Sequence, residues 1–142
     1  MGSSDSLALK GLLGALALCA SQLSAKQDCA IDRVLVKGDF GEARFTIEVA
    51  DEPAERSQGL MDRETMPRSA GMLFVYEAPQ PANFWMRNTL IPLDMIFADR
   101  GGRVRHIHQN AIPHDETPIH GGTDIYAVLE INGGLSKKYG FQ

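Results

Sequence analysis

Residues 71–98 constrain the fold more than any other part of the chain, because they hold two apolar runs separated by prolines. In the first run, residues 72–76, apolar side chains occupy both phases of a strand, which predicts a central strand buried on both faces. The second run, residues 93–98, predicts a further strand. We expect the proline-rich residues 78–81 to end the first strand and residues 84–88 to return as its antiparallel neighbour.

Shorter patterns complete a mainly β prediction. Residues 44–49 alternate apolar and polar side chains, as in a strand with one wet face. Acidic residues around Pro53 favour a helix start, and this short helix is expected to end near Arg63. The remaining expected elements are strands at 34–36, 104–108 and 125–131, a loop at 109–124 and a short helix from residue 135.

These elements predict a compact antiparallel sandwich or barrel with one short helix, in a mainly β fold class with a minor α component. A β–α–β arrangement is not expected, because only one helix of useful length lies between strands.

Residues 1–25 predict a signal peptide. Lys10 precedes a short apolar run at residues 11–20 and small residues follow it, which is the order found in secretory signals. The run is shorter than the ~20 apolar residues of a spanning helix, so no stable membrane insertion is expected after its removal. We therefore expect export to the periplasm or the extracellular space, with residues 26–142 as a single β-rich domain. Cleavage there leaves Cys29 as the lone cysteine, so no internal disulfide is expected.

Charge excludes one class of partner. The formal net charge is −4 and the pI is about 5.5, whereas a nucleic-acid-binding domain needs a basic surface. The glycine pairs lack the strand-to-helix context of a phosphate-binding loop. The sequence therefore predicts no nucleic-acid partner and no cofactor.

Four motifs occur in a fixed order along the chain. They are RSQGLMDR at residues 56–63, GMLFVY at 71–76, FWMRNT at 84–89 and IPLD at 91–94. Together they resemble the small bacterial and archaeal family known as domain of unknown function 192, from about the first strand to the chain end. The resemblance implies a mainly β fold and frequent export, and it implies no established reaction. Members usually continue beyond the equivalent of Gly140 with a final strand, so an edge strand is expected to be absent or the sequence truncated.

A candidate binding site lies within residues 84–94. If residues 84–89 form a strand, then Trp85, Arg87 and Thr89 share one face, where an aromatic ring and a guanidinium can hold a planar or anionic ligand. Asp94 would orient an arginine or Asn88. The predicted ligand-binding residues are Arg56, Arg63, Trp85, Arg87, Asn88, Thr89 and Asp94.

The same residues allow a purely structural interpretation, in which Trp85 packs in the core and Asp94 forms a buried pair with an arginine. Two other functions remain open. One is a hydrolase or isomerase that uses Asp94 and a histidine from residues 106–114 for acid–base chemistry. The other is a metal-binding protein that uses His106 and His108, which share a strand face. The preferred prediction is a module that binds an unknown small ligand or protein partner.

Overall fold

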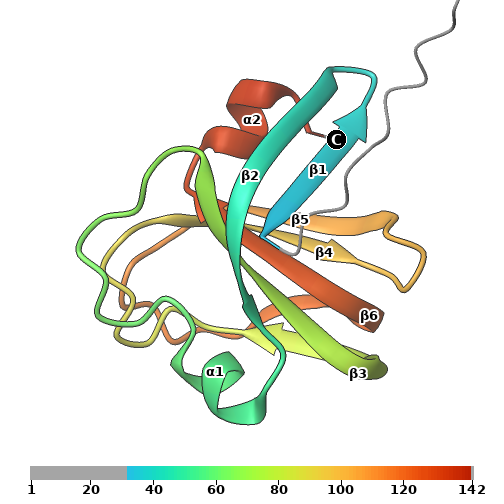
Figure 1. The fold of residues 1–142 in the computed structure, drawn as a ribbon. Helices are drawn as coiled ribbons and strands as arrows, with labels where there is room; N and C mark the ends of the chain where they lie inside the picture. The colour runs from blue at the N-terminus through green and yellow to red at the C-terminus, as the bar shows by residue number, and fades with distance from the viewer. Residues whose placement is uncertain (1–31, 142) are drawn as a thin grey trace, which may run out of the picture.

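The computed structural model describes residues 32–141. They form six strands and two short helices (Figure 1), in the order β1 (Arg33–Gly38), β2 (Gly41–Ala50), α1 (Pro53–Gln58), β3 (Ala70–Phe84), β4 (Leu93–Ala98), β5 (Val104–Ala111), β6 (Ile119–Asn132) and α2 (Leu135–Tyr139). The predicted signal peptide, Cys19 and Cys29 lie outside the described residues. Between residues 32 and 141, no helix is long and apolar enough to span a membrane.

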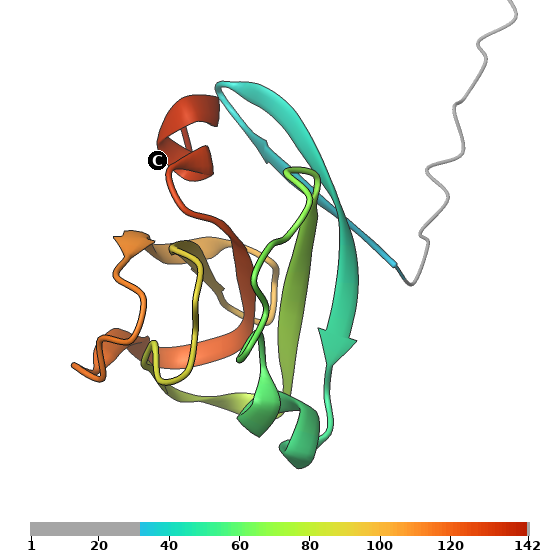
Figure 2. The same ribbon diagram turned by 90° about the vertical axis from the view of Figure 1, so that its left-hand side faces the viewer.

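All six strands belong to one sheet, in the order β1-β2-β3-β6-β4-β5. The sheet curls into a half-barrel, which Figure 2 shows nearly end-on. The mainly β prediction is confirmed. Four neighbouring pairs are antiparallel as expected, but β2 and β3 are parallel. The prediction against a β–α–β arrangement is therefore wrong: the connection through α1 returns the chain to the same end of the sheet, as parallel pairing requires.

β3 and β6 occupy the centre of the sheet, and apolar side chains cover both of its faces. One apolar cluster consists of Ala50, Leu60, Met72, Phe74, Ala82, Met86, Ile91, Leu93, Met95, Phe97, Ala111, Ile125 and Val128. The opposite face carries Ala43, Phe45, Ile47, Ile96, Leu129, Ile131, Leu135 and Phe141. Alternation along β6 explains the division, because Val128 faces the first cluster and Leu129 faces the second. The prediction that residues 72–76 are buried on both faces is confirmed only in part: Met72 and Phe74 are buried, whereas Leu73, Val75 and Tyr76 are partly buried.

β3 is longer than predicted, and the expected return strand at 84–88 does not exist. The strand continues through Pro79 and Pro81 to Phe84, where the chain enters a loop spanning residues 85–92. Pairing between β3 and β6 shifts register between Val75 and Gln80 and twice more before Asn83. Prolines lack a donor N–H, and such irregular pairing is where a strand tolerates them.

The two helices are short. α1 begins with a capping box between Glu52 and Glu55, which satisfies backbone N–H groups of its first turn. It ends at Gln58 rather than near Arg63, because Gly59 has a φ of +49° that breaks the helix. α2 follows β6 directly and packs Leu135 against the second apolar cluster.

Candidate functional site

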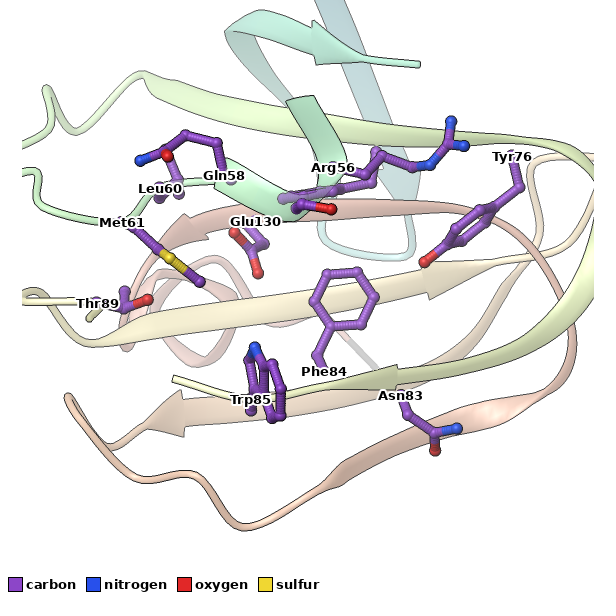
Figure 3. A pocket seen from close by; sticks show the side chains of 13 residues that line it. Arg56, Gln58, Leu60, Met61, Tyr76, Asn83, Phe84, Trp85, Thr89 and Glu130 are labelled. Carbon is purple, nitrogen blue, oxygen red and sulfur yellow. The ribbon is translucent and has the colours of Figure 1, made fainter. Parts of the chain in front are cut away.

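A cleft of about 120 Å³ lies between α1, β3 and the loop at residues 85–92 (Figure 3). Apolar and aromatic side chains make up much of its wall. Its lining residues are Arg56, Ser57, Gln58, Gly59, Leu60, Met61, Phe74, Tyr76, Asn83, Phe84, Trp85, Thr89 and Glu130. The volume of the cleft is that of about four water molecules in the liquid, so the cleft suits a compact ligand or the end of a larger one.

Glu130 lies at the centre of this cleft, and sequence reasoning missed it. Its register neighbours are Met72 on β3 and Met95 on β4, so it projects from the sheet on the side of the first apolar cluster. The residue is only 4% exposed, and Figure 3 shows its carboxyl directed into the cleft. None of the described side chains or backbone amides donates a hydrogen bond to it. Burial alone raises the pKa of Glu130 to about 8.

The loop at residues 85–92 holds Trp85 at the cleft. Met86, the next residue, is fully buried and its N–H donates to the carbonyl of Asp115 at 2.8 Å. Asn88 adopts a left-handed conformation with a φ of +50°, which asparagine tolerates better than most residues, and its carbonyl accepts from the N–H of Asp62 at 2.8 Å. These anchors leave Trp85 46% exposed, with its ring forming part of the cleft wall.

Arg87 lies beside Trp85, as predicted, but outside the cleft. Its guanidinium carbon lies 4.0 Å from the centre of the indole ring, and its Nη2 is 2.7 Å from a carboxyl oxygen of Glu116. This ion pair holds the pKa of Glu116 below its ordinary value. Arg87 therefore covers Trp85 from the solvent side and does not line the described cleft.

Two other predicted residues do line the cleft. The Arg56 side chain is 15% exposed and donates to the carbonyls of Asp51 and Val75 and, at 3.0 Å, to the carboxylate of Glu77. Its charge is thus compensated within the fold. Thr89 is buried, and its hydroxyl donates to the carbonyl of Arg87 at 3.2 Å.

Arg63, Asn88 and Asp94 are not among the lining residues. Arg63 forms a two-bond ion pair with Glu48 on the surface, with N–O distances of 2.5 and 2.6 Å. Asp94 has no exposed area.

The Asp94 carboxylate accepts three backbone N–H bonds, from Asn110 at 2.7 Å, Gly134 at 2.8 Å and Ser136 at 2.7 Å. These bonds join β4 to the end of β5 and to the start of α2. Asp94 is therefore a structural residue, and its partners are backbone amides rather than the expected arginine or Asn88.

The structure separates Asp94 from the two histidines of β5, His106 and His108. Asp94 and Met95 are consecutive in β4, so their side chains lie on opposite faces of the sheet. His108 pairs across from Met95 and His106 pairs across from Phe97, which places both histidines on the face opposite Asp94. Across residues 32–141, no group of three potential ligands is placed to hold a metal ion.

A sequence signal for Glu130 exists in retrospect. The residue interrupts the apolar run at 127–131, at the position in phase with Val128. An acid at an inward-facing position of a buried strand is uncommon unless it is paired or functional.

Comparison with known proteins agrees with this fold. Two crystal structures are similar to this chain, and each similarity covers 78% of it. The first is a protein of unknown function from Novosphingobium aromaticivorans DSM 12444, with 45% identity, 79% of that chain covered and a TM-score of 0.76. The second is a protein from Sinorhizobium meliloti 1021 described as a candidate transcription regulator, with 40% identity, 86% of that chain covered and a TM-score of 0.75. No curated protein matches the chain. The model of the family DUF192, described as "Uncharacterized ACR", matches residues 34–142. The chain belongs to the DUF192 family.

Proposed function

We propose that this protein is a binding module for a small ligand, which enters the cleft around Glu130. The observation that supports the proposal is a carboxyl group, almost fully buried, that faces the cleft and receives no hydrogen bond from the described residues. Among the described residues, Ser136 Oγ is the only fully buried polar side-chain atom without a partner, so the Glu130 oxygens keep access to the cleft, where a ligand can reach them. Such a carboxyl group is expected to find its partner in a ligand that the cleft admits.

The composition of the cleft favours binding over catalysis. Among its described lining residues, Glu130 is the only one with a carboxyl group, and there is no histidine or cysteine. The other titratable side chains in the wall are Arg56, which is paired with Glu77, and Tyr76, whose pKa is raised by burial. An acid–base enzyme would need a second titratable group within hydrogen-bond reach of the same substrate atom. Aromatic walls with a few convergent polar groups are typical of small-molecule sites.

The chain provides its own reporter for a binding test. Trp85 is the only tryptophan, so the single indole N–H signal in a ¹H–¹⁵N NMR spectrum reports on the cleft wall. A screen of compact neutral, anionic and cationic compounds should shift this signal in the wild type. The shift should disappear in Glu130→Leu and persist in Glu42→Leu, because Glu42 is a surface carboxylate paired with Arg44. If no compound shifts the indole signal or raises the melting temperature, the proposal is refuted.

Export of the protein is also part of this proposal. It is supported by the charge and hydropathy pattern of residues 1–25, and mass determination of the protein recovered from periplasm and medium would test it. Intact residues 1–25 in cytoplasmic protein alone would contradict export. We propose no nucleic-acid role, because the net charge is −4; the regulator description applies to the Sinorhizobium relative.

A further inference from the structure

We infer that the ligand is an uncharged molecule with an acceptor oxygen, such as an amide or ketone, and that the protonated Glu130 carboxyl donates a hydrogen bond to it. This inference rests on the proposed function and specifies the chemical class of the ligand. Three observations support it: the apolar surroundings of the Glu130 carboxyl, the donors that face the cleft, and the ion pair that already neutralises Arg56.

The surroundings of Glu130 disfavour its ionised form. Met72 and Met95 flank it in the sheet, and a carboxylate in such apolar surroundings loses hydration that nothing replaces. The charged and titratable groups on neighbouring elements do not compensate for this loss. Arg56 on α1 is bound to Glu77 and backbone carbonyls. The Tyr76 hydroxyl on β3 is neutral at pH 7, and burial raises its pKa further. His108 on β5 is separated from Glu130 by Met95.

Two hydrogen-bond donors face each other across the cleft. Figure 3 shows the indole nitrogen of Trp85 turned toward the carboxyl of Glu130, across the open part of the cleft. No hydrogen bond joins the two groups, so a ligand atom can lie between them. An indole N–H only donates, and a protonated carboxyl carries one O–H donor. An acceptor oxygen is therefore the atom that satisfies both.

Charge on the ligand would be unfavourable. An anion in the cleft would meet Arg56, whose guanidinium is already paired with Glu77, and an ammonium ion would first require Glu130 to ionise. Burying an ion without a complete partner costs more than burying a neutral polar group. The rings of Phe84 and Tyr76 in the wall suit the apolar body of a compact molecule.

Three probes of matched size separate the possibilities: propionamide, propionate and propylammonium. Only propionamide should shift the Trp85 indole signal. Its affinity should be constant from pH 5 to 7 and about tenfold lower at pH 9 than at pH 6, because the carboxyl of Glu130 loses its donor proton with a pKa of about 8.

Two variants test the role of the proton directly. Glu130→Gln keeps an N–H donor of the same shape, so it should bind propionamide with an affinity independent of pH. Glu130→Leu lacks the donor and should lose binding at every pH. Glu42→Gln, a surface control, should behave as the wild type does.

The outcomes distinguish this inference from the proposed function. If propylammonium or propionate shifts the indole signal instead, and Glu130→Gln abolishes that shift, the cleft binds ions; the inference is then wrong and the proposed function stands. If none of the three probes shifts the signal, the inference is also wrong. If the wider screen is silent as well, the proposed function fails with it.

Discussion

Replacement of Glu130 by glutamine should raise the free energy of unfolding, and the increase should grow with pH. The pKa of Glu130 is about 8 in the folded protein, against 4.5 for an ordinary glutamate. Between these values the folded state keeps a proton that the unfolded state has released, so stability falls as pH rises. The slope is about 1.4 kcal/mol per pH unit. The raised pKa of Glu130 therefore lowers the free energy of unfolding of the wild type by roughly 3 kcal/mol at pH 7 and by roughly 5 kcal/mol above pH 8. Below pH 4.5 this loss is absent.

Urea denaturation of both proteins from pH 5 to pH 8.5 measures this effect. The difference in free energy of unfolding between Glu130→Gln and wild type isolates Glu130, because other carboxyls, such as Glu48 with its lowered pKa, titrate alike in both proteins. Equal m-values would show that the two unfolding transitions expose the same surface. A difference that stays constant across this pH range would refute the reasoning. It would mean that the folded protein ionises Glu130 without penalty.

Other substitutions test the structural roles assigned to individual residues. Asp94→Ala leaves three backbone N–H groups without their acceptor and should lower the free energy of unfolding by about 3 to 5 kcal/mol in urea denaturation; a loss below 1 kcal/mol would contradict its structural role. Arg63→Ala removes only a surface ion pair and should cost less than about 1 kcal/mol, a loss that disappears in high salt. Gly121→Ala places a Cβ 1.9 Å from the Phe97 ring and should destabilise the protein by about 3 kcal/mol or more through overpacking, whereas a melting temperature equal to that of the wild type would show that the ring can move aside.

The sequence predicted strands well where the local pattern of apolar and polar residues was enough to identify them. The alternation at 44–49 lies within β2, and residues 93–98 form β4 with the predicted bounds. The prolines at 79 and 81 misled the prediction of β3, because their tolerance depends on shifted register against β6. That register depends on two strands far apart in the chain, so it cannot be predicted from the local sequence around the prolines.

The candidate site was predicted only in part, because its geometry depends on a loop conformation, on backbone partners and on strand pairing. The contact between Trp85 and Arg87 was expected from strand alternation, yet a loop produces it. Asp94 has backbone amides as partners, which have no signature in the sequence. The sequence signal for Glu130 is its break in the apolar run at 127–131, and strand pairing is what places the residue between Met72 and Met95.

The assembly of the cleft from dispersed segments has a kinetic consequence. Its walls come from α1 and the residues after it, from β3 and the following loop, and from β6. Pairing of β3 with β6 joins residues up to 60 positions apart, as in Gly71 with Ile131 at one end, and such distant pairing slows folding. A ligand that needs every wall in place would bind after the rate-limiting step. It should therefore lengthen the lifetime of the native state and leave the refolding rate unchanged.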